Sequence, residues 1–272
     1  METRITIIVD NVSDGNIKGE WGLSALVERG DRKILLDAGS TDLFLDNMKS
    51  LGIDVHDIDY AVLSHAHYDH ANGFPAFLDK NFAAKLYLRE STGPDCYAKK
   101  WIFRKYIGIP RVLLKKYGDR IVMVSGDFEL TDGVYLIPHK TEGLDRIGRR
   151  ELMYRKTPGG WIHDDFSHEQ SLVVETDKGL VILNSCSHGG AANIINEVKM
   201  TFPDKKVYGI IGGFHLFNKS EEEIRALAHK IRETGIEYVC TGHCTGARAF
   251  GILKEELKDT VHMMSVGYKI SF

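Results

Sequence analysis

Cysteine is scarce in this chain: 272 residues contain only four, Cys96, Cys186, Cys240 and Cys244. Four cysteines are too few for the disulfide framework that holds small secreted domains together. The sequence therefore favours a reducing compartment, the cytoplasm. The amino-terminal segment also lacks a basic head, an apolar stretch and a small-residue cleavage site. We therefore expect no secretory signal.

Long apolar runs and a basic excess are also missing. No stretch of 18 or more apolar residues occurs, which predicts that no helix spans a membrane. Lys and Arg number 35 against 38 Asp and Glu, for a formal net charge of −3. Nucleic-acid-binding proteins usually carry a strong basic excess, so we expect a small-molecule partner and no nucleic acid. The sequence does not determine the oligomeric state.

No proline- or serine-rich linker divides the chain, and 43% of its residues are hydrophobic. This is enough apolar material for one large core. We therefore expect a single domain, residues 1–272, with a basic insertion at about residues 90–165.

The spacing of apolar residues predicts alternating strands and helices. Strands are predicted at residues 4–9, 24–28, 33–36, 59–64, 85–88, 206–212, 237–241 and 264–270. Helices are predicted at residues 41–50, 74–80, 191–200, 220–234 and 247–257. Ser220 and Glu223 have the spacing of a capping box at the start of the fourth helix.

The second half of the chain repeats part of the first. Residues 24–28 (SALVE) correspond to residues 171–175 (SLVVE), and residues 33–37 (KILLD) correspond at the same offset to residues 180–184 (LVILN). Each half continues with further strands and helices. The repeat therefore predicts an α/β fold of two similar halves, in which two sheets pack together with helices outside.

Residues 99–120 are strongly basic, with eight Lys or Arg against one acid, Asp119. Aromatic residues are interspersed among them, for example Trp101 and Tyr106. One interpretation is a solvated helical insertion with its aromatic residues on the packed side. The other is a lid that presents positive charge to an anionic substrate.

The run His65-Ala66-His67-Tyr68-Asp69-His70 directly follows an apolar strand. A tight loop at such a place brings several side chains to one point, and imidazole with carboxylate suits zinc, iron or manganese better than magnesium or calcium. Four potential ligands in six residues exceed what one tetrahedral ion takes from one segment. The run therefore predicts one or two transition-metal ions, zinc before iron or manganese, and not merely a polar surface loop.

Further ligands must come from elsewhere in the chain. His188, His215 and His243 each follow a strand, and such strand ends face one edge of a sheet. His168 precedes the repeated strand and is placed near the same edge. We interpret the other histidines as surface or packing residues: His56, His139, His163, His229 and His262.

Two rival sites involve cysteine. Cys240 and His243 have the spacing of half a zinc knuckle, but a structural zinc site needs a second pair, which the sequence lacks. A hydrolase with Cys186 or Cys244 as the nucleophile is conceivable, but it leaves the histidine run without a role.

The histidine run resembles the signature loop of the metallo-β-lactamase superfamily. Asp37-Ala38-Gly39 is similar to the family's Asp-x-Gly, and His188 and His243 match its later histidines in order and spacing. The resemblance covers essentially the whole chain and implies a four-layer αββα sandwich. It also implies two metal sites, one with His65, His67 and His188, and one with Asp69, His70 and His243.

The sequence departs from this family at one position. Most relatives place a bridging Asp at the end of the strand that follows the His188 helix, but residues 207–213 here contain no carboxylate. His215 is the nearest polar residue. Either it replaces the bridge, or it binds substrate, or the second metal is held weakly.

A narrower resemblance rests on short motifs, which are DN (10–11), GLSAL (22–26), EQSL (169–172), CSHGG (186–190), GGFHL (212–216) and GHCTG (242–246). They resemble a subfamily of metal-dependent hydrolases that is often labelled as a dihydropterin-methyl ribofuranosylaminobenzene 5′-phosphate synthase. That label implies a transferase, which joins a dihydropterin-methyl diphosphate to a ribofuranosylaminobenzene 5′-phosphate.

From the superfamily we expect a metal-dependent hydrolase, in which metal-activated water attacks an anionic small molecule of phosphate-bearing or ester type. Asp69 is expected to orient the nucleophile and His215 to donate a proton or bind substrate, while Asn11 and His168 are expected to contact substrate. The alternatives are the transferase and a non-catalytic ligand-binding module on the same fold.

Overall fold

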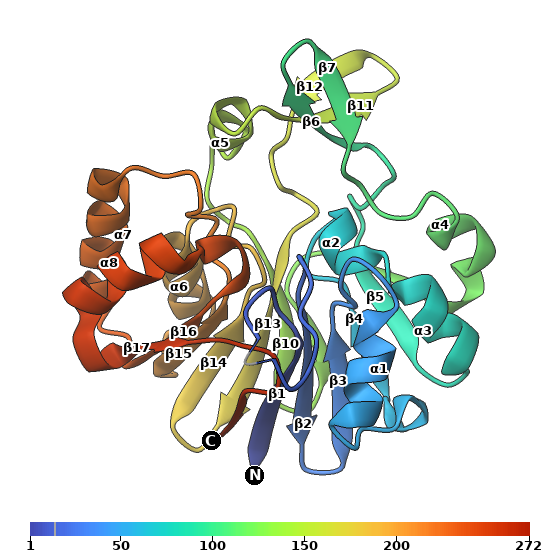
Figure 1. Cartoon of the computed structure of the whole chain (residues 1–272), viewed down its shortest axis with the longest axis horizontal. Helices are drawn as coiled ribbons and strands as arrows, with labels where there is room; N and C mark the ends of the chain where they lie inside the picture. Colours follow the sequence, from blue (N-terminus) through green and yellow to red (C-terminus); the bar gives the residue numbers. More distant parts are fainter. Residues whose placement is uncertain (14) are drawn as a thin grey trace.

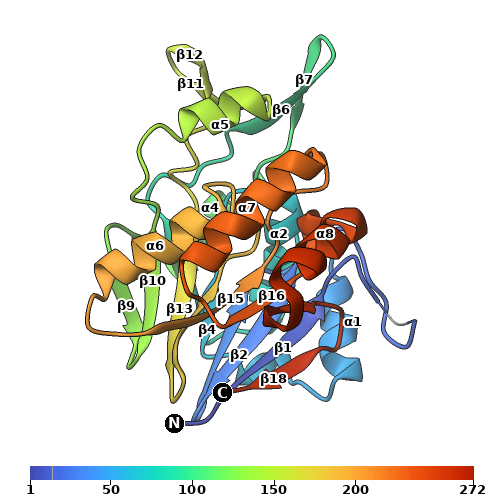
Figure 2. The same cartoon turned by 90° about the vertical axis from the view of Figure 1, so that its left-hand side faces the viewer.

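Two seven-stranded sheets form the body of the protein (Figures 1 and 2). The structure is a computed structural model that describes residues 1–13 and 15–272. The first sheet has the order β18-β1-β2-β3-β4-β5-β8. Its strands are β1 (Thr3–Val9), β2 (Ser24–Arg29), β3 (Arg32–Leu36), β4 (Tyr60–Val62), β5 (Lys85–Arg89), β8 (Ile121–Val124) and β18 (Lys269–Ser271).

The second sheet has the order β17-β16-β15-β14-β13-β10-β9. Its strands are β9 (Phe128–Thr131), β10 (Val134–Pro138), β13 (Gln170–Thr176), β14 (Gly179–Leu183), β15 (Val207–Gly212), β16 (Tyr238–Thr241) and β17 (Val261–Met263). The predicted strand at residues 264–270 is wrong in part, because residues 264–268 lie between β17 and β18. The last strand, β18, returns to the first sheet and pairs with β1.

Helices cover the outer face of each sheet (Figure 1). On the first sheet they are α1 (Leu43–Ser50), α2 (Tyr68–Ala71), α3 (Phe74–Lys80) and α4 (Leu113–Lys116). On the second they are α6 (Ala191–Thr201), α7 (Glu221–Glu233) and α8 (Ala247–Leu257). Within the described residues, no helix is long and apolar enough to cross a membrane.

Three separate buried clusters establish the four layers. Phe44, Phe74 and Phe77 belong to a cluster between the first sheet and its helices. A second cluster fills the space between the two sheets. A third, including Ile195 and Leu253, lies between the second sheet and α6, α7 and α8. Burial of apolar area on both faces of both sheets holds the layers together, and it confirms the αββα sandwich.

The predicted repeat is visible in the strand pairing. The strands β2 and β3 form an antiparallel hairpin, as do β13 and β14. Each hairpin is continued by parallel strands, β4, β5 and β8 in the first sheet and β15, β16 and β17 in the second. Because the carboxyl ends of parallel strands meet at one edge, both halves present their loops to the same end of the sandwich.

A third, four-stranded sheet lies above that end, and we call it the cap sheet. It consists of β6 (Cys96–Lys100), β7 (Phe103–Tyr106), β11 (Met153–Thr157) and β12 (Gly160–His163), and α5 (Asp145–Arg150) lies beside it. The interpretation of the basic segment as helical is therefore wrong over these strands. Tyr97 pairs with Tyr106 across β6 and β7, with ring centroids 5.3 Å apart, and such aromatic pairs stabilise strands.

Candidate metal centre

The predicted site residues meet at the carboxyl ends of the parallel strands. Asp37 follows β3, and the histidine run follows β4, with His67 as the residue before α2. From the other half, His188 lies between β14 and α6, and His243 follows β16. The expectation that these strand ends face one edge is therefore confirmed by the parallel pairing.

His65, His67 and His188 form one group of possible ligands. Ligand atoms of the three rings lie within 4.8 Å of one another, and the residues are 0%, 4% and 4% exposed. Nε2 of His65 and of His67, and both ring nitrogens of His188, have no hydrogen-bond partner. Burial lowers the pKa of His67 to about 3 and those of His65 and His188 well below the usual value. The rings are thus neutral and offer lone pairs.

Asp69, His70 and His243 form the second group. Asp69 Oδ2 lies 3.8 Å from His70 Nε2 and 3.7 Å from His243 Nε2. Trp21 Nε1 donates to the same oxygen at 2.9 Å. Burial lowers the pKa of His243 to about 3. Burial also acts to lower the pKa of His70, but the carboxylates of Asp69 and Asp37 outweigh it and raise that pKa to about 9.

Buried imidazole nitrogens without partners are costly unless something binds them. Neutral imidazole and carboxylate are also the donors that zinc, iron and manganese accept, and an ion at His70 Nε2 would displace the proton that Asp69 and Asp37 favour on this ring. The residues present therefore fit transition-metal ions at both groups.

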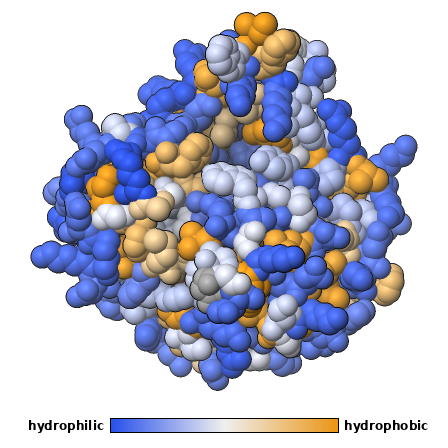
Figure 3. Space-filling model, viewed as in Figure 1, coloured by the Kyte–Doolittle hydropathy of each residue, from blue (hydrophilic) through white to orange (hydrophobic). Residues whose placement is uncertain are grey.

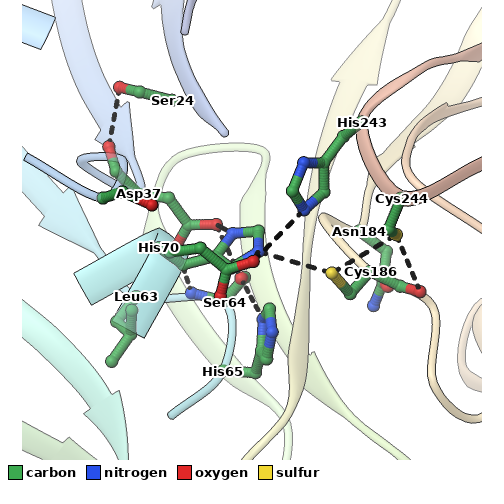
Figure 4. A network of polar contacts seen from close by, with 12 residues as sticks. Ser24, Asp37, Leu63, Ser64, His65, His70, Asn184, Cys186, His243 and Cys244 are labelled. Atoms are coloured by element: carbon green, nitrogen blue, oxygen red, sulfur yellow. Dashed lines mark hydrogen bonds and ion pairs between the residues drawn. The ribbon is translucent and has the colours of Figure 1, made fainter. Parts of the chain in front are cut away.

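Asp37 orients the ligands of the first half (Figure 4). Its Oδ1 accepts the backbone N–H of Ser64 at 2.7 Å, and its Oδ2 accepts the Ser64 hydroxyl at 2.7 Å and His70 Nδ1 at 2.8 Å. Ser64 Oγ in turn accepts His65 Nδ1 at 2.8 Å. These bonds place the proton of each ring on Nδ1 and leave Nε2 directed into the site. The Asp-x-Gly motif thus acts behind the ligands.

Asn11 is bonded to the candidate ligand His243. Its Oδ1 accepts His243 Nδ1 at 2.8 Å, and its Nδ2 donates to the His243 carbonyl at 2.8 Å. The neighbouring Asp10 is fully buried and accepts the His243 backbone N–H at 3.1 Å. Asn11 therefore positions His243 through its amide; the residue is exposed, and its expected substrate contact stays a prediction.

His168 is also a positioning residue in the structure. Its Nδ1 accepts the backbone N–H of Ala66 at 3.1 Å, and its Nε2 faces Asp164 Oδ2 at 3.2 Å. The residue is 1% exposed. Its expected contact with substrate is therefore not supported, since both ring nitrogens are bonded and the ring supports the loop between His65 and His67.

His215 lies at the mouth of the site, beside two adjoining cavities. A cavity of about 290 Å³ is lined by His188, His215, Arg150, Lys219 and Lys230, among others. A smaller one, of about 150 Å³, is lined by His67, Asp69, Cys186, His188 and His215, and by Ala98, Ile107 and Met153 from the insertion. Since His188 and His215 line both cavities, the two adjoin at these histidines, and the smaller one lies over the histidine run.

The insertion covers the site with apolar side chains, and the basic lid interpretation is wrong in this respect. Within the described residues, no Lys or Arg of residues 99–120 lines either cavity. Arg104 instead lies over the rings of Tyr154 and Trp161, and Lys116 pairs with Asp79. The basic residues at the cavity are Arg150, beyond the basic segment, and Lys219 and Lys230, from the second half.

Sequence reasoning missed several residues around the site. Glu151 Oε2 lies 3.9 Å from His215 Nε2, and Glu151 is also bonded to Lys219. His139, interpreted as a surface or packing residue, is buried between Glu169 and Glu197. Cys240 packs between the two sheets, so the zinc-knuckle interpretation is wrong. Nothing in the spacing of these residues indicates their partners.

The backbone at the site is strained. Asp37, Ser187, His215 and His243 have φ values of 58°, 47°, 51° and 46°, a left-handed conformation that residues other than glycine rarely adopt. Such strain persists only where the surroundings impose it, and it is concentrated at functional sites. All four residues lie in loops at the strand ends that carry the candidate ligands.

These features define the class of protein: a four-layer αββα sandwich with a divalent-metal site at the shared edge of its sheets. The chain belongs to the metallo-beta-lactamase superfamily, whose family model matches residues 22–243.

Two relatives resemble the whole chain. The 7,8-dihydropterin-6-methyl-4-(beta-D-ribofuranosyl)-aminobenzene-5'-phosphate synthase of Methanocaldococcus jannaschii is 30% identical, over 93% of this chain and 90% of its own. The crystal structure of Tm1679, described as a metal-dependent hydrolase of the beta-lactamase superfamily, is 29% identical with a TM-score of 0.82, over 98% of both chains. A diphosphatase from the PhnP family shares the fold, with a TM-score of 0.58 at 14% identity, over 100% of this chain and 98% of its own.

Proposed function

We propose that the protein is a metal-dependent hydrolase that acts on an anionic small molecule carrying a phosphate or an ester-type bond. One observation carries the proposal: buried imidazole nitrogens without partners, from both halves of the chain, converge with Asp69 beneath a cavity. A purely structural site would satisfy these nitrogens with hydrogen bonds.

The two groups differ in the ligands they offer. His65, His67 and His188 would hold one divalent ion, zinc in our proposal, and Asp69, His70 and His243 would hold a second. A cation in this site supplies Lewis acidity, which stabilises charge on a carbonyl or phosphoryl oxygen and makes hydroxide available near neutral pH. Asp37, Ser64 and Asn11 hold the ligand rings in the orientation that this chemistry needs.

The cavity suits a small anionic molecule. Its volume of about 290 Å³ is close to the lower end of small-molecule sites, roughly 300 Å³. Arg150, Lys219 and Lys230 line it together with Glu151 and Glu223, which leaves an excess of one positive charge, while Phe214 and Leu216 supply apolar surface. The insertion gives the smaller cavity, beside the histidine run, an apolar side through Ala98, Ile107 and Met153.

His215 and Asp69 are placed to move protons. The His215 side chain is 13% exposed, lines both cavities and has an unpartnered Nδ1. We assign it the transfer of a proton to the leaving group, with Glu151 orienting the ring from its Nε2 side. Asp69 Oδ2, held by Trp21, faces both candidate ligands and is placed to orient the attacking group.

Metal content and turnover test the proposal together. Protein purified without added metal should contain one or two transition-metal ions, and a screen of phosphodiesters, lactones and thioesters should find a substrate. His67→Ala should lower kcat/KM by at least about 100-fold, the size of effect that loss of a positioned catalytic group produces. His56→Ala, an exposed histidine, is the control. Equal activity in wild type and His67→Ala would overturn the proposal.

A second candidate is a transferase that joins a dihydropterin-methyl diphosphate to a ribofuranosylaminobenzene 5′-phosphate. It is favoured by the 30% identity to the synthase of Methanocaldococcus jannaschii. The diphosphate donor should be supplied with and without the acceptor. Diphosphate release that needs the acceptor, with a joined product by mass spectrometry, identifies a transferase. Release in water alone identifies a hydrolase.

A third candidate is a ligand-binding module without activity, which bound metal without turnover would support. The setting we propose for any of these functions is the cytoplasm. All four cysteines are unpaired and buried, as a reducing compartment allows.

A further inference from the structure

Cys186 has no role in the site described so far, yet it lies at its centre. It follows β14 in the loop that leads to His188 and is 4% exposed. Its Sγ lies 3.3 Å from His70 Nε2 and 3.4 Å from Cys244 Sγ. Figure 4 shows Cys186 between His70 and the loop that carries His243 and Cys244.

The sulfur of Cys186 is close to both groups of candidate ligands. It lies within 4.8 Å of ligand atoms of His65 and His70, and likewise of those of His188 and His215. It also lies within 4.8 Å of ligand atoms of His243 and Cys244. His65 and His188 belong to the first group, and His70 and His243 to the second. Cys186 Sγ therefore lies beside both candidate metal positions.

The separations match those between ligands of one ion. In a tetrahedral zinc site, with Zn–N near 2.1 Å and Zn–S near 2.3 Å, nitrogen and sulfur ligands lie roughly 3.6 Å apart. Cys186 Sγ and His70 Nε2 are 3.3 Å apart. Asp69 Oδ2 is 3.7 Å from His243 Nε2 and 3.8 Å from His70 Nε2, distances of the same size.

A carboxylate has no room at the end of β15. A β-carbon at Gly213 would lie 2.5 Å from Cys244 Sγ and 2.7 Å from the carbonyl oxygen of Ser185. A β-carbon at Gly212 would lie 1.9 Å from the carbonyl oxygen of Asn184. Cys244, whose sulfur lies 3.4 Å from that of Cys186, thus stands where a side chain at Gly213 would have to pass.

We propose that Cys186, as a thiolate, is a metal ligand shared by the two groups, in place of a bridging carboxylate. This inference rests on the proposed metal centre. When the sulfur–metal bond forms, the S–H proton passes to water, and no oxidation or reduction is involved. Cys244 supports the ligand, because its S–H donates to Cys186 Sγ while its own sulfur accepts the His215 backbone N–H at 3.2 Å.

Cobalt substitution tests the inference without reference to activity. Chelated protein is titrated with Co²⁺ and its absorption recorded. Visible ligand-field bands report that histidines bind cobalt, and a near-ultraviolet charge-transfer band reports a thiolate ligand. We expect both in the wild type, and loss of the charge-transfer band in Cys186→Ser with retained ligand-field bands. Cys96→Ser, Cys240→Ser and Cys244→Ser should keep both.

The outcomes separate the inference from the proposed function. No cobalt binding by the wild type would contradict the metal centre itself. Cobalt binding without a charge-transfer band would leave the metal centre intact and overturn the role of Cys186. A band that disappears in Cys244→Ser or Cys96→Ser, but persists in Cys186→Ser, would also overturn it.

Metal affinity provides a second readout. Cys186→Ser should weaken binding of one ion by more than the roughly 10- to 100-fold that loss of an outer partner costs. Cys186→Asp replaces the thiolate with a carboxylate and should restore part of this affinity without the charge-transfer band. Unchanged Zn²⁺ affinity in a folded Cys186→Ser protein, checked by circular dichroism, would contradict the inference.

Discussion

At the scale of single residues, the candidate ligands can be predicted from the sequence, but the side chains that hold them in place cannot. The histidine run predicts its own chemistry because four donors occupy six positions. Asn11 and His168 are predicted to contact substrate, but the bonds that each makes inside the protein were not predicted. Asn11 lies 232 positions from His243, and His168 lies 102 positions from Ala66. Contacts between residues so far apart in the sequence depend on how the two halves pack, which the spacing of residues along the chain does not indicate.

Asp37 bonds to Ser64 and His70 behind the candidate ligands, and its substitution tests whether such bonds contribute to metal affinity. In Asp37→Asn, one of the two carboxylate oxygens becomes an NH2 group. This group presents a donor to the donors of Ser64 or His70 that the oxygen accepted. Metal affinity should fall by about 10- to 100-fold, the usual cost of losing an outer partner. Competition with a chromogenic chelator measures it. Asp46→Asn, an exposed acid on α1, should bind metal as the wild type does. Equal affinities in the two variants would contradict the assigned role of Asp37.

At the scale of elements, the helices α6, α7 and α8 of the second half were predicted to within one residue at either end. The helix α7 begins after Ser220 as the capping box requires: Ser220 Oγ accepts the Glu223 N–H, and the Glu223 carboxylate accepts the Ser220 N–H. The helix α8 has the predicted bounds, Ala247–Leu257. The cap sheet was missed because its basic and aromatic residues carry no clear period, and its aromatic residues pair across strands that sequence alone does not align.

The capping box of α7 should contribute measurably to stability. Ser220→Ala removes the acceptor of the Glu223 N–H, so we expect a loss of about 1 kcal/mol in the free energy of unfolding. Ser220→Gly should lose only a few tenths of that, and Ser220→Thr should retain most of it. Urea unfolding followed by circular dichroism measures the difference. If Ser220→Ala and Ser220→Thr were equally stable, the cap would contribute nothing.

His139 joins three elements through buried charges, and its titration should shape stability against pH. It follows β10 and lies between Glu169, before β13, and Glu197, on α6. Burial acts to lower its pKa, but the two carboxylates outweigh burial and raise it to about 10. Because the folded state holds this proton more tightly, the stabilisation is complete below the unfolded pKa of about 6.5 and is lost as pH rises towards 10.

The measurement is the free energy of unfolding in urea between pH 6 and pH 10. The wild type should lose stability over this window, and His139→Gln should be less stable at pH 6 and change less with pH. His229→Gln, an exposed histidine on α7, should follow the wild type. Parallel curves for wild type and His139→Gln would contradict the raised pKa.

At the scale of the whole molecule, the fold was predictable because the same strand pattern occurs in both halves of the sequence. The repeated hairpin fixed the pairing of β2 with β3 and of β13 with β14, and the following apolar segments became the parallel strands. How the halves pack was not readable from either half. The smaller cavity and Cys186 lie where the halves meet, and the larger cavity, with Arg150, Lys219 and Lys230, lies between the insertion and the second half.

Metal binding should therefore stabilise the chain as a whole, since His65 and His67 come from one half and His188 and His243 from the other. A ligand that binds only the folded state, at 100 times its dissociation constant, adds about 2.7 kcal/mol. For a chain of this size, each kcal/mol shifts Tm by roughly 2–4 °C. Chelation should thus lower the wild-type Tm by about 5–10 °C in differential scanning fluorimetry, and added Zn²⁺ should restore it. His67→Ala should respond less to chelation and His56→Ala as the wild type does, whereas a wild-type Tm unaffected by chelation would contradict a metal shared between the halves.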